Sequence, residues 1–297
     1  MHGLLTGTLQ VEHITVAISD LPETLAGVRL VQLSDFHFDG LRLSPSLLQA
    51  ALAATQAARP DLIVLTGDYV TDDPEPIWEL AGHLGTLQAT YGICAVLGNH
   101  DIEWPQARTI ITQALASVGI EVLWNQVSYP LGPGIAVVGL ADFWSREFRP
   151  APLFQSLPPN VPRLVLSHNP DSAEVLQRWR VDLQLSGHTH GGQIVIPGWG
   201  PLPAYTRTWM QRIPPWLRRR IPSPLFNQNC DRVILHWEWS QGLHRVGANQ
   251  LYVNRGLGTY LPGRFCCPPE VTVITLTPAS HHPQAQSVLR LESVSVG

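Results

Sequence analysis

Short apolar runs alternate with polar loops along most of the chain, and this pattern predicts a mixed α/β fold. Five of the runs are rich in Val, Ile and Leu, as buried strands are: VRLVQL, PDLIVL, ICAVL, PRLVL and DLQL. The last two of these runs predict strands at 162–166 and 182–186, and further strands are predicted at 120–124 and 134–140 and in the C-terminal runs 232–239, 250–254 and 271–277. Helices are predicted between strands, so the chain alternates between the two.

Three segments carry helix signals. Residues 44–58 begin with Ser44 as N-cap and Pro45 at the first helical position, and Pro60 stops them. The other two helices are predicted at 76–89 and 105–118.

A polar cluster follows each of five apolar runs. The clusters are SDFHFDG at 34–40, TGDYV at 66–70, GNHD at 98–101, SHNPD at 167–171 and GHTHGG at 187–192. Each is expected where a buried strand ends in a loop, so that five strand ends meet at one pocket. The candidate ligands combine oxygen and imidazole groups without a thiolate: Asp35, His37, Asp68, Asn99, His168, His188 and His190. Such a set suits Mn, Fe or Zn and indicates a two-metal hydrolase site.

The spacing of the candidate ligands adds a geometric constraint. Asp35 and His37 are two residues apart, so they share a face of a regular strand and turn toward one ion only where the strand ends. His188 and His190 have the same spacing. Glycine beside such residues lets the backbone turn tightly and leaves room for an oxyanion. Three clusters contain one, namely Gly67, Gly98 and Gly187.

The motif order D-x-H, G-D, G-N-H-[DE], H and G-H-x-H resembles that of the calcineurin-like metallophosphoesterases, over about residues 28–277. GHTHGGQI, with YVNRGLGT at 252–259 and PPE at 268–270, is similar to the bacterial YkuE and YaeI-type branch. The resemblance implies a four-layer αββα sandwich of two mixed β-sheets flanked by helices, as a single domain over 1–297. It also implies a metal-dependent phosphoric ester hydrolase, because members of the branch act on phosphoesters and one relative cleaves UDP-diacylglucosamine pyrophosphate.

The resemblance further implies two divalent ions, with Mn expected and Fe or Zn as alternatives. One ion would be held by Asp35, His37, Asp68 and His190, and the other by Asp68, Asn99, His168 and His188. A hydroxide held between the ions would attack phosphorus in line, without a covalent intermediate. His100 would donate a proton or hydrogen bond to the leaving oxygen, and Asp101 would orient its imidazole.

Other interpretations stay open at this point. A lone Asp or His after a strand is often a turn residue or helix cap, although no ligand position of the family pattern is missing here. The main alternative is a non-catalytic scaffold that uses this fold to bind a protein partner.

Substrate contacts are predicted at three positions. Arg255 is a candidate for a phosphate contact because a guanidinium matches two phosphate oxygens, with an ordinary salt bridge as the alternative. Asn99 lies at the metal site, and Gly191 would let a substrate approach the backbone unless it marks a strand bulge. Asp39 and Asp142 are expected to be turn residues.

Composition agrees with a globular enzyme. The chain has 297 residues, of which 44% are hydrophobic and 14% charged, which predicts one domain with a large core. The net charge of −4 gives no general reason to bind nucleic acid. The four cysteines, Cys94, Cys230, Cys266 and Cys267, lack C-x-x-C spacing, so no structural zinc site is predicted.

Residues 197–226 form an insertion rich in Pro, Trp and Arg. Apolar anchors mixed with cations are typical of interfacial segments, so one interpretation is a peripheral membrane contact that selects an amphiphilic phosphoester. The other is a loop that packs its tryptophans on the body. The N-terminus MHGLLTGTLQVEH shows no signal peptide or transmembrane helix, which favours a cytoplasmic enzyme, with the insertion as a contact to the inner membrane.

Overall fold

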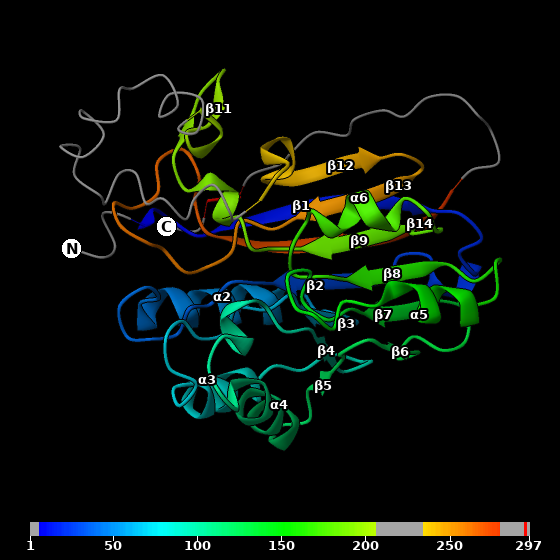
Figure 1. The fold of residues 1–297 in the computed structure, drawn as a ribbon, viewed down its shortest axis with the longest axis horizontal. Coiled ribbons are helices and arrows are strands. Elements are labelled where there is room, and N and C mark those ends of the chain that lie inside the picture. Colours follow the sequence, from blue (N-terminus) through cyan, green and yellow to red (C-terminus); the bar gives the residue numbers. More distant parts are fainter. Residues whose placement is uncertain (1–5, 206–233, 280–293, 296–297) are drawn as a thin grey trace.

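The computed structural model describes residues 6–205, 234–279 and 294–295, and two β-sheets form the centre of the fold (Figure 1). The strands of the first sheet are β1 (Gln10–Ile18), β2 (Arg29–Leu33), β3 (Leu62–Leu65), β4 (Ile93–Ala95), β5 (Glu121–Val122), β14 (Glu270–Pro278) and β15 (Val294–Ser295). Their order is β15-β1-β14-β2-β3-β4-β5.

The second sheet contains β6 (Gln126–Ser128), β7 (Ala136–Gly139), β8 (Arg163–Leu166), β9 (Leu183–Ser186), β12 (Gly242–Val246) and β13 (Asn249–Val253). Their order is β12-β13-β9-β8-β7-β6. A separate antiparallel pair, β10 (Val195–Ile196) and β11 (Gly200–Pro201), follows the last histidine cluster of the sequence.

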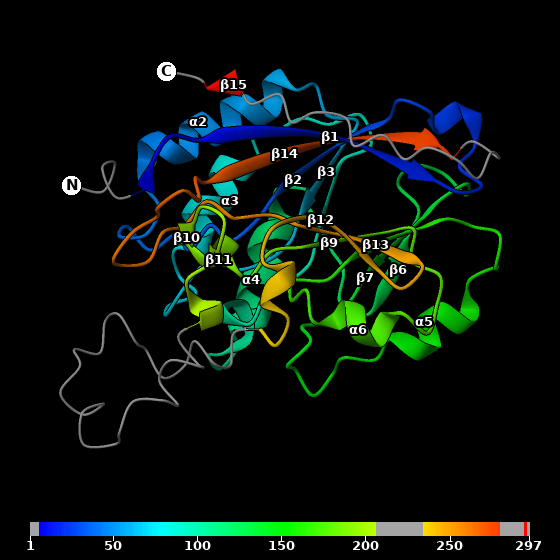
Figure 2. The ribbon, with the colours of Figure 1, turned by 90° about the horizontal axis from the view of Figure 1, so that it is seen from above.

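Helices cover the outer faces of both sheets. The α-helices are α2 (Pro45–Ala57), α3 (Ile77–Leu84), α4 (Ala107–Ser117), α5 (Pro150–Ser156) and α6 (Ser172–Leu176). Four 3-10 turns are η1 (Glu23–Leu25), η2 (His100–Ile102), η3 (His190–Gly192) and η6 (Trp237–Trp239). Figure 2 shows α2 on one side of the molecule and α5 and α6 on the other, with strands of both sheets between them. No helix among these described residues is long and apolar enough to cross a membrane.

Alternation along the strands divides the core into layers. On β3, Leu62 and Val64 belong to the core between the sheets, whereas Ile63 and Leu65 pack with the residues of α2, α3 and α4. On β8, Val165 packs outward with Phe154 and other residues near α5. A strand that is apolar on both faces must be covered on both, so this packing gives the predicted αββα sandwich.

Parallel pairing brings the polar clusters to one edge of each sheet. β2 runs parallel to β3 and β3 to β4, and in the second sheet β7, β8, β9 and β13 are parallel in turn. The two sheets are linked just below this edge by Gln32, whose Nε2 donates to the Ser186 carbonyl (2.9 Å) and to Thr66 Oγ1 (3.0 Å). The carboxyl ends of both sheets therefore meet.

Two predicted elements differ from the structure. The strand predicted at 232–239 is wrong over its described part. The Asp171 carboxylate accepts hydrogen bonds from the amides of Leu235 (2.7 Å) and His236 (3.1 Å), and the chain then forms η6. The helix predicted to reach residue 89 ends at Leu84, with Gly85 as its C-cap. Strands β1, β6 and β12 were not predicted.

Candidate metal centre

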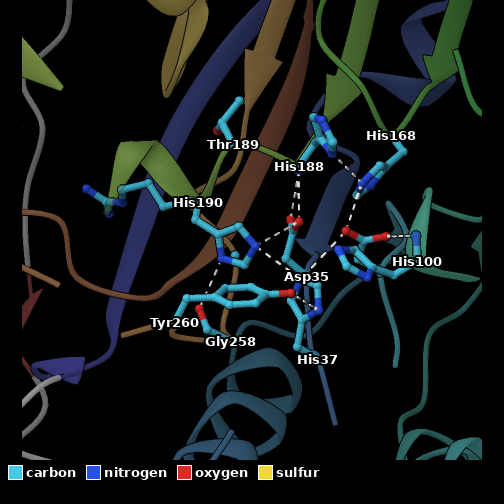
Figure 3. Close-up of polar contacts among 12 residues, drawn as sticks. Asp35, His37, His100, His168, His188, Thr189, His190, Gly258 and Tyr260 are labelled. Atoms are coloured by element: carbon cyan, nitrogen blue, oxygen red, sulfur yellow. Dashed lines mark hydrogen bonds and ion pairs between the residues drawn. The ribbon is translucent and has the colours of Figure 1, made fainter. Parts of the chain in front are cut away.

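Six of the seven predicted ligands meet in overlapping groups at the joined edges of the two sheets (Figure 3). One group contains Asp35, His37 and His190, and another contains Asp68, His168 and His188. Within each group the ligand atoms lie within 4.8 Å of one another. These six side chains follow four of the five predicted strand ends, and His100 of the fifth lies in a group with His37 and Asp68.

The first cluster, Asp35, His37 and His190, is contributed by both sheets. His37 Nε2 and His190 Nε2 lie 3.1 Å apart, and His190 Nε2 is 3.6 Å from Asp35 Oδ1. Asp68 reaches this cluster as well, because its Oδ2 is 3.6 Å from His37 Nε2. The cluster thus has the composition predicted for one ion.

The second cluster, Asp68, His168 and His188, is tighter. His168 Nε2 lies 3.1 Å from Asp68 Oδ2 and 3.1 Å from His188 Nδ1. Because Oδ2 of Asp68 faces both clusters, this carboxylate is positioned to bridge them.

Backbone carbonyls fix two of the imidazoles in the tautomer that a metal needs. His168 Nδ1 donates to the Thr66 carbonyl (2.7 Å), and His190 Nδ1 donates to the Gly258 carbonyl (3.1 Å). In both rings this leaves the Nε2 lone pair directed at the cluster. Such an outer hydrogen bond is characteristic of metal-binding histidines.

Five of the candidate ligands have a left-handed backbone conformation. Their φ angles are +51° at Asp35, +44° at His37, +55° at Asp68, +72° at His188 and +51° at His190. Such angles are uncommon for residues other than glycine and cost of order 1–2 kcal/mol each. These φ angles let residues two positions apart, such as Asp35 and His37, point toward the same centre, as their spacing in the sequence required. Backbone strain of this kind concentrates at functional sites.

Two glycines make room for the carboxylates. A Cβ at Gly98 would collide with Asp68 Oδ1, and a Cβ at Gly187 would collide with Asp35 Oδ2 and Ser34 Oγ. The loops can therefore approach the two carboxylates only if these positions lack a side chain.

Burial and neighbouring charges shift the pKa values of the candidate ligands. Burial, together with the Asp68 charge, raises the pKa of Asp35 to about 6. Although burial alone would lower it, the Asp68 carboxylate raises the pKa of His168 to about 10. Burial lowers the pKa of His37 to about 3, which keeps this imidazole neutral. The two carboxylates outweigh the single positive charge of protonated His168. A bound cation would take the place of the His168 proton and balance the negative charge of the site.

Asn99 provides an independent indication of a cation. Its Oδ1 is buried and has no hydrogen-bond partner among the described residues. A buried amide oxygen normally accepts a hydrogen bond, and a divalent cation would satisfy it equally well. The residues present therefore fit two divalent ions with Asp68 shared.

His100 lies beside the cluster and is held from two sides. Its backbone N–H donates to Asp68 Oδ1 (3.0 Å), and its Nδ1 donates to the Thr71 carbonyl (3.1 Å). Its ring also belongs to a third potential ligand group with His37 and Asp68. The position is compatible with a proton donor beside the ions.

The role predicted for Asp101 requires correction. Its carboxylate does not hold the His100 imidazole, which is bonded to Thr71 instead. Asp101 Oδ2 accepts the amides of Asp68 (2.8 Å) and Gly98 (2.8 Å), and Oδ1 accepts the amide of Tyr69 (2.9 Å). Asp101 therefore orders the backbone that carries Asp68.

The surroundings of Arg255 and Gly191 favour structural roles. Arg255 Nη2 lies 2.7 Å from Glu12 Oε1, and its Nε lies 2.6 Å from Glu270 Oε2. These ion pairs match the salt-bridge interpretation and give no support to a phosphate contact. A Cβ at Gly191 would meet Cys267 Sγ, so packing already accounts for this glycine.

Several other predictions concern single residues. Asp39 accepts the amides of Leu41 and Arg42, and Asp142 accepts the amide of Trp144, so both serve in turns as expected. Cys94, Cys266 and Cys267 are free, whereas Cys230 and residues 206–226 of the insertion lie outside the described residues.

Four residues of the site were missed in the sequence. Thr66 and Gly258 act through backbone carbonyls, which leave no trace in side-chain patterns. Thr71 Oγ1 (3.3 Å) and the Tyr260 hydroxyl (3.1 Å) both contact His37 Nδ1. Tyr260 directly follows the YVNRGLGT run, and this position was the one signal in the sequence that could have identified it as part of the site.

Comparison with known proteins supports this assignment. The family model described as calcineurin-like phosphoesterase matches residues 28–192, which include all seven candidate ligands. The chain belongs to the calcineurin-like phosphoesterase family. It is therefore a metallophosphoesterase and a hydrolase, and the family uses divalent metals.

Three bacterial relatives are similar over most of the chain. Phosphodiesterase YaeI of Escherichia coli K12 is 32% identical, with 86% of this chain and 84% of that protein covered. UDP-2,3-diacylglucosamine pyrophosphatase LpxG of Chlamydia trachomatis is 29% identical, with 86% of each covered. The metallophosphoesterase YkuE of Bacillus subtilis is 30% identical, with 89% of this chain and 84% of that protein covered.

Proposed function

We propose that this metallophosphoesterase hydrolyses phosphodiesters or pyrophosphates with two divalent cations that share Asp68. The observation that carries the proposal is the position of Asp68 Oδ2 between the two clusters, 3.1 Å from His168 Nε2 and 3.6 Å from His37 Nε2. Mixed oxygen and imidazole ligands suit Mn, Fe or Zn, and Mn²⁺ is the metal we propose first.

When bound, the two cations would polarise the phosphoryl group and lower the pKa of a water to near neutrality. The remaining tasks belong to the protein. His100 donates a proton to the leaving oxygen, and the Thr71 carbonyl holds its Nδ1 so that the ring keeps a fixed orientation. The buried first cluster and Asp68 exclude bulk water, which strengthens each interaction with the phosphate.

Hydrolysis of bis-p-nitrophenyl phosphate and p-nitrophenyl phosphate tests this proposal. Metal-stripped protein should be inactive, added Mn²⁺ should restore turnover, and Asp68→Ala should stay inactive with Mn²⁺ present. Turnover by Asp68→Ala equal to that of the wild type would refute the shared-ligand proposal. Binding of fewer than two Mn²⁺ per chain would refute the dinuclear site.

We further propose that the substrate is amphiphilic, with its apolar part in a pocket beside the metal centre. This pocket, of about 680 Å³, is lined by Trp199, Tyr205, Leu235 and Trp237 among others. Its volume is in the range of small-molecule sites. Its wall meets the histidine turn, because the Ser240 carbonyl accepts a hydrogen bond from Thr189 Oγ1 (2.6 Å).

The charge of this pocket supports an apolar occupant rather than a second phosphate. Among the described residues that line it, Glu238 is the one charged side chain, and no Arg is present. Trp199 is 70% exposed and Tyr205 is 40% exposed, so both offer uncovered aromatic surface. A phosphodiester or pyrophosphate attached to an acyl group fits such a neighbourhood, and LpxG, by its name, acts on a diacylglucosamine pyrophosphate.

A series of p-nitrophenyl alkyl phosphodiesters of increasing chain length tests the pocket. The wild type should show a KM that falls as the alkyl chain grows, and Trp237→Ala should remove this dependence while leaving the methyl ester unaffected. Trp78→Ala is the matched control, because Trp78 is 48% exposed but lies on α3. A KM independent of chain length in the wild type would contradict an apolar subsite.

The peripheral membrane contact through 197–226 is also a proposal. It is tested by flotation with liposomes of anionic lipid, in which binding should weaken as salt is added. Protein found wholly in the soluble fraction would contradict it.

A further inference from the structure

We propose that Arg264 is a positioning residue that holds the loop 256–260 against the first cluster and thereby sets the affinity for one of the two ions. The inference rests on the proposed two-ion site. It concerns a part of the chain beyond the family-model match, which ends at residue 192.

The guanidinium of Arg264 is a hub of hydrogen bonds to the backbone. Its Nη2 donates to the carbonyls of Gly258 (2.7 Å), Arg255 (2.8 Å) and Gly256 (3.1 Å). Its Nη1 reaches the carbonyls of Cys267 (3.3 Å) and His190 (3.4 Å), and its Nε donates to Thr259 Oγ1 (3.1 Å). One side chain thus ties together three segments of the site, namely 255–259, the turn at His190 and the backbone at Cys267.

Arg264 has no carboxylate partner among the described residues, in contrast to Arg255 nearby. Its N–H groups donate to backbone carbonyls and to the Thr259 hydroxyl, and a guanidinium has five such N–H groups in one plane. Arg264 therefore acts as a clamp for backbone rather than as an ion-pair partner or a phosphate ligand.

The loop that Arg264 holds touches every member of the first cluster. The Gly258 carbonyl accepts the Nδ1 proton of His190 (3.1 Å), and the Gly258 amide donates to the Asp35 carbonyl (2.7 Å). The Tyr260 hydroxyl lies 3.1 Å from His37 Nδ1 (Figure 3). The loop thus determines the orientation of the first cluster.

The second cluster takes most of its support from elsewhere, although the His188 amide donates to Asp35 Oδ1 (2.9 Å) in the first cluster. His168 Nδ1 is held by the Thr66 carbonyl after β3, and the backbone of Asp68 is held by Asp101. Loosening the loop 256–260 should therefore affect the two ions unequally. Loss of an outer contact of this kind typically weakens metal affinity about 10–100-fold.

Arg264→Gln tests the inference through metal binding itself. Equilibrium dialysis against Mn²⁺ should give two ions per chain in the wild type with similar affinities, and in the variant one ion with wild-type affinity and one weakened about 10–100-fold. Electron paramagnetic resonance gives a second readout, because the spectrum of a coupled Mn²⁺ pair should be replaced by that of a single ion. Arg264→Lys keeps the positive charge and most of the aliphatic side chain, so its affinity for the weakened ion should lie between those of the wild type and Arg264→Gln.

Arg163→Gln is the matched control. Arg163 also donates to three backbone carbonyls, those of Leu157, Pro158 and Arg180 (each 3.3 Å), but it begins β8 at the end opposite His168. Its replacement should lower stability and leave both ions bound. This separates positioning of the metal site from a general role in folding.

The outcomes distinguish this inference from the proposed function. Two Mn²⁺ with unchanged affinities in both Arg264 variants would overturn the role of Arg264 and leave the dinuclear site intact. An equal loss of both ions would overturn the claim of selectivity. Failure of the wild type to bind two ions would instead refute the proposed function. If Arg264→Gln does not fold, Arg264→Lys decides the question with the same readouts.

Discussion

His37 Nε2 and His190 Nε2 face each other at 3.1 Å, although the two residues are 153 positions apart and follow strands of different sheets. Burial lowers the pKa of both imidazoles, to about 3 for His37 and well below its usual value for His190. Two neutral rings with nitrogens this close need either a shared proton or a cation between them. The same contact joins the two sheets, so a cation there would stabilise the fold.

Removal of metal should therefore destabilise the protein. At Mn²⁺ concentrations about 100-fold above the dissociation constant, binding to the folded state contributes about 2.7 kcal/mol. For a chain of 297 residues, an unfolding entropy of about 2.1 cal/mol/K per residue converts this to a rise in Tm of roughly 4 °C for each ion. Thermal unfolding with EDTA and with Mn²⁺ measures the difference. An identical Tm in both conditions would contradict a structural contribution from the ions.

Replacement of Asp101 by Asn should lower stability as well as activity. Each carboxylate oxygen accepts two backbone amides, so an asparagine in either orientation would direct its NH₂ group at one of these pairs of donors. Leaving these donors unpaired should cost about 2–4 kcal/mol, measured by urea unfolding. Asp73→Asn is the control, because Asp73 is exposed and accepts one amide, that of Glu75. A loss of turnover at full stability would instead revive the predicted catalytic role of Asp101.

His100→Ala should affect chemistry without affecting metal content. Removal of a general acid typically lowers kcat about 10²–10⁴-fold, and KM should change little. The loss should be smaller for an ester whose leaving group needs no proton, such as p-nitrophenolate. Mn²⁺ stoichiometry is the decisive companion measurement, because the His100 ring also lies within reach of His37 and Asp68. Loss of an ion from the variant would make His100 a ligand.

The candidate ligands could be predicted from sequence because each polar cluster comes shortly after a buried strand, whereas the αββα sandwich was implied by the resemblance to a known family. Alternation places Leu62 and Val64 on one face of β3 and Ile63 and Leu65 on the other, and parallel strands then bring their ends together. The spacing of Asp35 and His37 even required a turn of the backbone, which the structure shows as positive φ.

The outer contacts of the site did not follow from sequence. The Gly258 carbonyl and the Arg264 guanidinium act on His190 across 68 and 74 positions, and a backbone acceptor has no residue type that would reveal it. The prediction for 234–239 was wrong for a related reason. The carboxylate of Asp171, which is distant in sequence, accepts hydrogen bonds from the amides of Leu235 and His236, which would have paired with a neighbouring strand. Long-range polar contacts of this kind override local propensity.

Adding one methyl group at Gly98 or Gly187 should disable the site without unfolding the protein. A Cβ at Gly98 would collide with Asp68 Oδ1, and a Cβ at Gly187 would collide with Asp35 Oδ2, so either substitution must displace a carboxylate from its cluster. Gly98→Ala should weaken both ions because Asp68 faces both clusters, whereas Gly187→Ala should weaken chiefly the ion of the first cluster. Displacements near 1 Å can lower turnover about 10²-fold.

Gly82 provides the control for these two substitutions. It lies within α3, and a Cβ there would meet nothing within 4 Å. Gly82→Ala should therefore keep full activity and gain about 0.5–1 kcal/mol of stability, because alanine favours a helix over glycine. Mn²⁺ binding and turnover measured for all three variants decide the matter. Wild-type metal binding in Gly98→Ala would mean that the loop can move away from Asp68, and the close approach would then not be needed for the site.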